Sequence, residues 1–328
     1  MFRWAIGIDL GGTAIKAAVV GEQEGIVTER IIPTDTSSGP EGIVEQLAVL
    51  IAALKEQGSL FYDVSGFAGI GLGAPGAVNV TSGTLSYPPN LPGWTVFPLR
   101  DALQNCLKEK ENLSASVILE NDANAAAFGE AVYGAGKNFS DFLMVTLGTG
   151  VGGGIILNRE LYRGANGTAG EVGFMIVDFE GSSVHAGIRG TIESLIGKER
   201  IVELARRMAE ENPTACLAVA ELCSHDFTRL SPRHLEQAAK QGDPLSLALW
   251  QSVGGILGVG LANVTALMDI RKFVIGGGIS AAGDLIIKPA FDQLRRSTLP
   301  SMHEGLDIVP ALLGNRAGMY GAAALCFV

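Results

Sequence analysis

Short apolar runs alternate along this chain with longer segments whose apolar residues recur at helical spacing. The short runs are typical of strands, which we expect at residues 4–10, 14–20, 26–32, 67–72, 117–119, 142–147, 155–157 and 273–275. The longer segments predict helices at residues 41–57, 123–133, 198–211 and 245–268. Because strands and helices follow one another along the chain, the pattern indicates an α/β fold.

Two of these strand pairs repeat each other. Ile8–Val20 reads IDLGGTAIKAAVV and Val145–Leu157 reads VTLGTGVGGGIIL, so each predicts an apolar strand, a tight Gly/Thr turn and a second apolar strand. A turn without side-chain bulk presents bare backbone N–H groups, which suit a phosphate. Thr13 and Thr149 add hydroxyl donors, and Asp9 is placed where it could hold a hydrated magnesium ion.

Neither repeat fits the common nucleotide-binding motifs. The Walker A pattern GxxxxGK[ST] is absent, and each Gly turn is followed by a strand where a dinucleotide motif has a helix. A third glycine group, GGGIS at residues 276–280, closes the strand at 273–275. It suits the flat face of a base or ribose, and an ordinary strand-to-helix turn explains it as well.

Composition narrows the class of protein. The chain has 328 residues, with 24 basic and 34 acidic side chains and a net charge of −10, and no basic block stands anywhere in it. Binding to nucleic acid needs clustered Lys and Arg, so we expect no such partner. Its four cysteines, at positions 106, 216, 223 and 326, have no CxxC spacing, which favours free thiols in a reducing cytosol.

One segment is long enough to cross a membrane. Residues 245–268 carry no charge. They also contain polar side chains and four glycines, and no cationic asymmetry flanks them. A helix buried against a sheet is therefore the preferred interpretation, and we expect no membrane association.

The stretch ENDANAAA, residues 120–127, places Asn121 and Asp122 directly before an alanine-rich helix. One interpretation is helix capping, in which either side chain accepts hydrogen bonds from the free N–H groups of the first turn. The other is that Asp122 takes a proton from a substrate. The residues alone leave both open, and one of the two can cap while its neighbour faces a substrate.

The whole chain resembles the ROK family (repressors, open reading frames, kinases) of the sugar kinase–actin superfamily. The motifs that carry the resemblance are GIDLGGT, GLGAPGAV, YPPNLPGW, ENDANAAAFGE, VTLGTGVGGGI, GTAGEVG, GTIES and FVIGGGIS, in this order. The resemblance implies a two-lobed, actin-like ATPase fold built from duplicated ribonuclease H-like domains, with ATP opposite a sugar in a central cleft. The lobes expected are residues 1–119, completed by a C-terminal helix at 314–328, and residues 120–313.

Members of this family are kinases or sugar-sensing repressors. The repressors carry a helix-turn-helix before the first phosphate loop, and here that loop begins within ten residues of Met1, so we expect a kinase. Phosphoryl transfer depends on positioning and on charge neutralisation, with a carboxylate that orients the attacking hydroxyl. The resemblance makes Asp122 that base.

The resemblance also assigns the binding residues. Sugar hydroxyls would be bound by Asn121, Asp122, Glu171, Glu193 and, as weaker candidates, Asn90 and Gly76. ATP phosphates and their magnesium ion would be held by Asp9, Gly11, Gly12, Thr13, Gly148, Thr149 and Gly150, and the adenosine by Gly276, Gly277 and Gly278.

This chain departs from the family at a zinc site. Relatives commonly have a histidine three residues after the position of Glu171, followed by a CxCGxxGCxE cluster. Here the four ligand positions hold Phe174, Val184, Ala186 and Thr191, none of which replaces an imidazole or thiolate ligand, so we expect no zinc. We expect apolar packing of Phe174, Val184 and Ile192 to hold the loop, and His185 to be an ordinary loop residue.

We therefore expect a cytoplasmic kinase that uses ATP and Mg²⁺ to phosphorylate a hexose hydroxyl. The 6-hydroxyl of glucose or of a close analogue is the preferred acceptor, and the loss of the histidine at position 174 weakens the claim for glucose itself. The alternatives are a non-catalytic sugar-sensing protein and a kinase for N-acetylhexosamine or fructose. A homodimer is what the family suggests.

Overall fold

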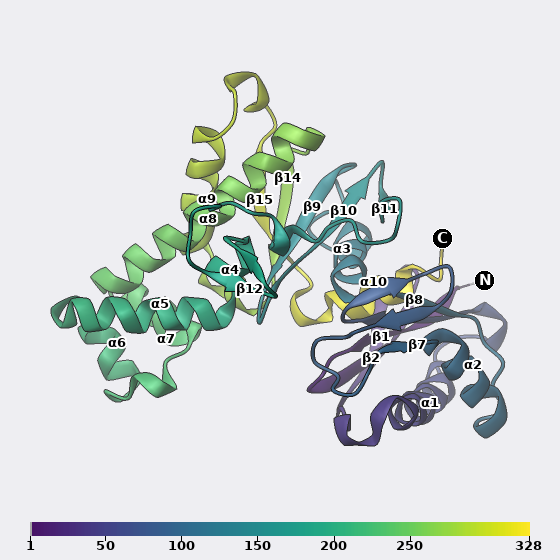
Figure 1. Ribbon diagram of the computed structural model, residues 1–328. Helices are drawn as coiled ribbons and strands as arrows, with labels where there is room; N and C mark the ends of the chain where they lie inside the picture. The colour runs from purple at the N-terminus through teal and green to yellow at the C-terminus, as the bar shows by residue number, and fades with distance from the viewer. Residues whose placement is uncertain (1) are drawn as a thin grey trace. The chain divides into compact units, whose positions relative to one another are not determined.

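The computed structural model describes residues 2–328, and the chain divides into two compact units. The first consists of Met1–Ser140, Gly154–Gly170 and Leu312–Val328, and the second of Asp141–Gly153 and Glu171–Ala311. Both combine sheets with helices, so the predicted α/β class is confirmed (Figure 1). The lobe boundary expected between residues 119 and 120 stays a prediction. By packing, residues 120–140 lie with the first unit.

The main sheet of the first unit has the strand order β3-β2-β1-β4-β8. Its strands are β1 (Trp4–Leu10), β2 (Ala14–Gly21), β3 (Gly25–Pro33), β4 (Phe67–Ala74) and β8 (Val117–Asn121). The first three form antiparallel pairs, whereas β1, β4 and β8 run parallel. Parallel strands end at the same edge of a sheet, so the residues that follow β1, β4 and β8 come together there.

Smaller elements complete this unit. Strands β5 (Ala77–Asn79), β6 (Thr84–Ser86) and β7 (Val96–Phe97) form a small antiparallel sheet, and β10 (Val151–Leu157) pairs with β11 (Glu160–Tyr162). The helices are α1 (Gly39–Gly58), α2 (Leu99–Lys110), α3 (Asp122–Tyr133) and α10 (Ala317–Ala324). The helix expected at residues 314–328 is therefore α10, shorter at both ends.

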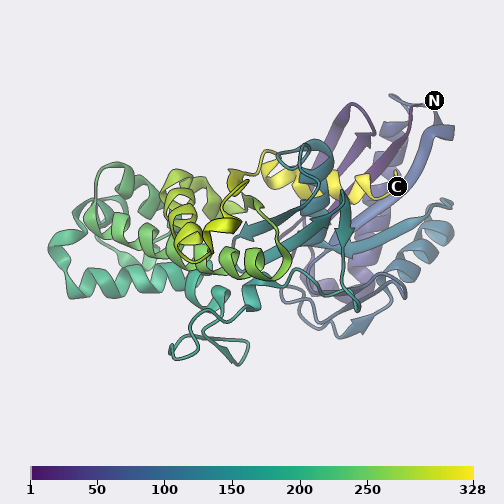
Figure 2. The same ribbon diagram turned by 90° about the horizontal axis from the view of Figure 1, so that it is seen from above.

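The two faces of β1 pack against different helices because side chains alternate along a strand. Trp4, Ile6, Ile8 and Leu10 belong to the large core shared with α1 and α2. The opposite face has small residues, so α10 lies almost in backbone contact with the sheet: a Cβ at Gly7 would lie 1.9 Å from the carbonyl oxygen of Met319. Figure 2 shows α10 running beside these strands.

The second unit is built on the parallel strands β9 (Phe142–Leu147), β14 (Lys272–Gly276) and β15 (Asp307–Pro310), with the start of β10 beside β9. Two short strands, β12 (Val184–His185) and β13 (Ile188–Arg189), form an exposed hairpin. The helices are α4 (Ile192–Ile196), α5 (Lys198–Glu211), α6 (Leu217–Leu222), α7 (Pro232–Lys240), α8 (Pro244–Met268) and α9 (Asp284–Arg296).

Helix α8 is long and apolar enough to cross a membrane by length and composition alone, yet 61% of its most apolar stretch is buried. It packs along α9 and contacts α4, α5 and α7. A Cβ at Gly258 would lie 2.4 Å from the carbonyl oxygen of Ala290, so the glycines of α8 allow the backbone of α9 to come close. This packing agrees with the expectation of a buried core helix.

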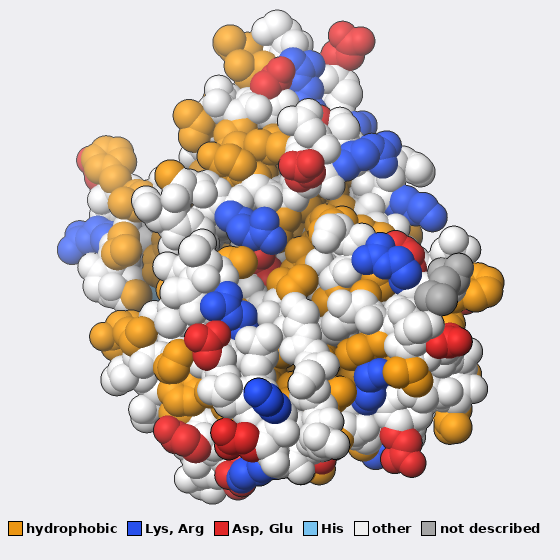
Figure 3. Space-filling view, turned by 90° about the vertical axis from the view of Figure 1, so that its right-hand side faces the viewer, with side chains coloured by type: hydrophobic (Ala, Val, Ile, Leu, Met, Phe, Trp, Pro, Cys, Tyr) orange, Lys and Arg blue, Asp and Glu red, His pale blue; other side chains and the backbone are white. Residues whose placement is uncertain are grey.

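Basic and acidic side chains are interspersed on the surface drawn in Figure 3. On that face the lysines and arginines of the described residues are separated by acidic, apolar and uncharged side chains.

Candidate active site

The first Gly/Thr turn lies at the carboxyl end of β1, where the sheet brings several predicted residues together. The turn is closed by a 3.1 Å hydrogen bond from Gly11 N to the carbonyl of Ala14, and Thr13 is its exposed tip. Asn90 lies directly against it, since a Cβ on Gly12 would be 2.4 Å from the Asn90 carbonyl oxygen. Only glycine allows this approach.

Asp9 lies beside the same turn and is paired with Lys16. The two residues face each other across β1 and β2, and Lys16 Nζ donates to Asp9 Oδ2 at 2.8 Å. Both side chains are mostly buried. The carboxylate that the sequence assigned to a magnesium ion therefore has a cationic neighbour, which lies on β2 just after the turn and could also contact a phosphate.

The junction of β8 and α3 resolves the question of capping. Asn121 is the N-cap residue: its Oδ1 accepts hydrogen bonds from Ala123 N at 2.9 Å and Asn124 N at 3.1 Å. Its Nδ2 donates to the carbonyl of Gly76 at 3.2 Å, which ties the junction to the loop after β4. Asp122 is the first residue of the helix, and its Oδ1 accepts from Ala123 N at 2.9 Å.

Glu120, which was not predicted to be a site residue, fixes this junction through buried hydrogen bonds. Its side chain is 1% exposed, and Oε1 accepts hydrogen bonds from Asn121 N at 2.9 Å and Asn124 Nδ2 at 3.0 Å. Oε2 accepts from Arg163 Nε at 2.6 Å. Both carboxylate oxygens are thus satisfied, as a buried charge requires. The network fixes the backbone on which Asp122 stands.

The second Gly/Thr turn lies in the second unit and also joins two strands, but a tighter hydrogen bond closes it. Gly148 N donates to the carbonyl of Gly150 at 2.9 Å, and Thr149 is again the exposed tip. The start of β10 is held by Glu193, whose Oε2 accepts from Val151 N at 2.6 Å. The predicted phosphate turn and a predicted sugar ligand are therefore in direct contact.

Glu171 and Glu193 are neighbours that affect each other's charge. The pKa of Glu171 is raised above its ordinary value of 4.5, first because protein atoms shield the carboxyl from water and second because the Glu193 charge lies close by. The side chain of Glu171 also has a solvent-exposed surface. The structure brings both predicted glutamates to one place.

The loop between these glutamates is held differently from our expectation. Val184 is 56% exposed and so does not pack into the loop, which makes that part of the prediction wrong. Phe174 is half-exposed as well, with its ring 6.0 Å from that of His185. Among residues 2–328, no three His, Cys, Asp or Glu side chains gather in a way that could hold a metal ion.

The third glycine group follows β14 and lies against the end of β9. Gly277 has a φ of +85°, and a Cβ there would lie 2.3 Å from the Leu147 carbonyl oxygen, so the position requires glycine. Gly278 lines a pocket of about 200 Å³ together with Arg233, Glu236 and Trp250 of α7 and α8. Those three side chains were not predicted, because nothing in their sequence links them to residues 276–278.

The chain matches the ROK family over residues 5–327. It is 35% identical to the glucokinase of Halalkalibacterium halodurans over 324 residues, which cover 98% of this chain and 94% of that protein. The glucokinase of Streptomyces coelicolor is 33% identical over 321 residues, or 98% of this chain and 96% of that protein.

A similar solved structure is the ROK family glucokinase of Streptomyces griseus in complex with glucose and AMPPNP. It has a TM-score of 0.80 and 33% identity, and the match covers 98% of each chain. The resemblance seen in the sequence motifs is thereby confirmed, and the chain belongs to the ROK family.

Proposed function

We propose that this protein is an ATP-dependent sugar kinase that transfers the γ-phosphoryl group to a hexose hydroxyl, with the 6-hydroxyl of glucose or of a close analogue as the acceptor. The observation that carries the proposal is the β8–α3 junction, where Asn121 serves as the helix cap and Asp122 follows it on a rigid element. The similar proteins named as glucokinases support it independently.

Asp122 would act as the general base. It stands in the first turn of α3, where the positive end of the helix dipole favours an ionised carboxylate. An ionised carboxylate within hydrogen-bond reach orients the attacking hydroxyl and accepts its proton as the phosphoryl group is transferred. The buried Glu120 network keeps the backbone at this point from shifting.

Sugar hydroxyls need acceptors and donors, and the other predicted residues supply them. In the first unit these are Asn121, Asn90 and the backbone at Gly76, and in the second unit they are Glu171 and Glu193.

The two Gly/Thr turns would hold the ATP phosphates through backbone N–H groups and the hydroxyls of Thr13 and Thr149. Magnesium would be bound at Asp9, and a single carboxylate fits this ion because Mg²⁺ keeps several waters and takes its other ligands from phosphates. The bound ion would neutralise phosphate charge. The base would bind beside Gly278, in the pocket that Arg233, Glu236 and Trp250 also line.

An ADP-release assay across a panel of hexoses tests the proposal. The panel contains glucose, mannose, fructose and N-acetylhexosamines, and inorganic polyphosphate replaces ATP in parallel reactions. Turnover that depends on glucose or a close analogue supports the proposal, and turnover with another member of the panel assigns a different acceptor. Sugar binding without any turnover would instead indicate a sugar sensor. We infer that the enzyme acts in the cytoplasm. Membership of the ROK family suggests that it forms a homodimer.

A further inference from the structure

Glu193 is held from two sides by groups that belong to different segments. Its side chain is 15% exposed. Oε2 accepts from Val151 N at 2.6 Å, and Oε1 lies 2.6 Å from His185 Nε2. Because each oxygen has its own partner, the plane of the carboxylate is fixed. Neither the turn at residues 148–150 nor the β12–β13 hairpin can move without disturbing Glu193.

His185 is itself placed by its surroundings. It lies in β12, paired with Ile188 of β13, and its ring is 6.0 Å from that of Phe174 at an angle of 48°. The imidazole therefore stands between the aromatic ring at position 174 and the carboxylate at position 193. Nε2 must carry a proton to donate to the carboxylate, which both the neutral tautomer and the cation allow.

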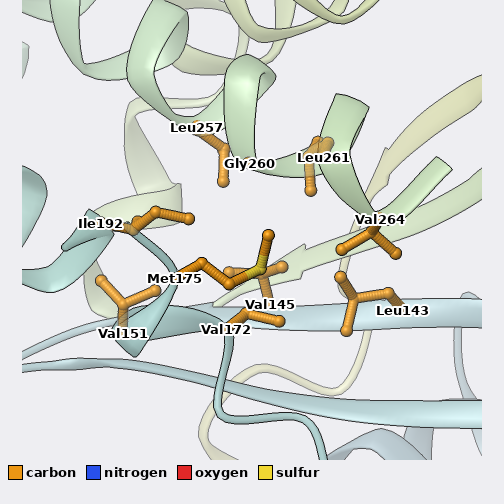
Figure 4. Close-up of a pocket in the computed structure, with 10 residues that line it drawn as sticks. All are labelled: Leu143, Val145, Val151, Val172, Met175, Ile192, Leu257, Gly260, Leu261 and Val264. Carbon is orange, nitrogen blue, oxygen red and sulfur yellow. The ribbon is translucent and has the colours of Figure 1, made fainter. Parts of the chain in front are cut away.

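The base of this loop is anchored in the core of the second unit. Met175 lines a small cavity of about 10 Å³ together with apolar side chains that include Val145, Ile192 and Leu261 (Figure 4). Ile192 N also donates to the Met175 carbonyl at 3.0 Å. The hairpin beyond it carries exposed side chains, and the 2.6 Å contact between His185 Nε2 and Glu193 Oε1 links it to α4.

We propose that His185 is a positioning residue of the sugar site, forming with Glu193 a metal-free clamp that joins the β12–β13 hairpin to the turn at residues 148–151. The proposal rests on the proposed function, since it assigns His185 an effect on sugar binding through Glu193. The clamp takes the place of the zinc ligands that positions 174, 184, 186 and 191 lack. It sets the orientation in which Glu193 meets a sugar hydroxyl.

Steady-state kinetics of three variants test the clamp. In His185→Ala the KM for the sugar should rise about tenfold, because a charge-assisted hydrogen bond to Glu193 is lost. The turnover number and the KM for ATP should change much less. His185→Gln should recover part of the sugar affinity, since its side-chain amide can still donate to the carboxylate. Arg189→Ala, an exposed change in the same hairpin, should behave like the wild type.

Amide hydrogen exchange provides a readout that needs no turnover. Residues 177–190 should exchange faster in His185→Ala than in the wild type or in Arg189→Ala. An unchanged sugar KM in His185→Ala, or an equal rise in Arg189→Ala, overturns the positioning role. Unchanged exchange overturns the clamp itself. If the wild type lacks sugar-dependent turnover the proposed function fails, and the exchange result still decides whether the clamp exists.

Discussion

Two carboxylates that support the candidate site are held in opposite ways. Glu120 is fully buried and has three partners, two from the β8–α3 junction and one from Arg163. Glu193 lies nearer the surface, where its partners are a backbone N–H group and the half-exposed His185. A buried, fully bonded carboxylate gives rigidity, whereas an exposed pair costs little to break. The β8–α3 junction, which carries the proposed base, therefore lies on the more rigid support.

The largest effect is expected at the base that this rigid junction presents. Asp122→Asn should lower the turnover number about 10³-fold, since an amide cannot accept the proton, while sugar binding is largely retained. ADP-release kinetics and calorimetric sugar binding measure the two quantities. Asp101→Asn is the matched control, because Asp101 is also an acid in the first turn of a helix, here α2. Near wild-type turnover in Asp122→Asn would remove Asp122 from the mechanism.

The contrast in burial is tested by breaking the Arg163–Glu120 contact in one variant and the His185–Glu193 contact in another. Arg163→Met leaves the Glu120 carboxylate buried without its cation and should lower the free energy of unfolding by about 3 kcal/mol. His185→Ala should lower it by no more than about 1 kcal/mol, as for exposed pairs. Urea denaturation measures both. Arg159→Met, in the same β10–β11 hairpin and with an exposed side chain, serves as the control. Equal losses in the two variants would contradict the comparison.

A smaller effect is expected at the first phosphate turn. Asp9→Asn removes the carboxylate proposed for magnesium and should raise the KM for MgATP about tenfold, while the KM for the sugar stays constant. Lys16→Met should act in the same direction, because Lys16 is paired with Asp9. Both constants come from the same initial-rate assay. A selective change in the sugar KM would show that this turn serves the acceptor instead of the donor.

The smallest effect concerns the pH dependence at Glu171. A carboxyl whose folded-state pKa is raised contributes stability below its unfolded pKa, near 4.5, and this contribution is lost as the pH rises through the folded value. Glu171→Gln has no carboxyl to ionise. Relative to the wild type, its free energy of unfolding should therefore increase as the pH rises from 4 to 7. The difference is small because the side chain is exposed. Urea denaturation of both proteins across this pH range measures the difference.

Much of the fold is predictable because its central strands are short, continuous apolar runs that are buried on both faces. The strand expected at residues 4–10 coincides with β1, and the helix at residues 198–211 coincides with α5. Helix α2 was missed because LRDALQNCLKEK is largely polar and buries only Leu99, Leu103 and Leu107. Helix α9 was missed because Pro289 interrupts its pattern.

The site was predictable only where short motifs mark it. The two Gly/Thr turns and the junction at Asn121 and Asp122 form as expected, because turn and cap chemistry is local. The role of Glu120 depends on its burial and on its contact with Arg163, which is 43 residues away in the sequence. A local sequence pattern does not predict such a contact. The only hint in the sequence was that an acidic residue directly precedes the capping residue Asn121. The contact between His185 and Glu193 likewise depends on how the loop folds back.

A crystal structure with glucose and a non-hydrolysable ATP analogue tests the central claim most directly. The account predicts that a carboxylate oxygen of Asp122 lies within hydrogen-bond distance, about 2.6–3.2 Å, of the sugar hydroxyl that faces the γ-phosphate. A bound sugar with every hydroxyl beyond reach of Asp122 would contradict the account.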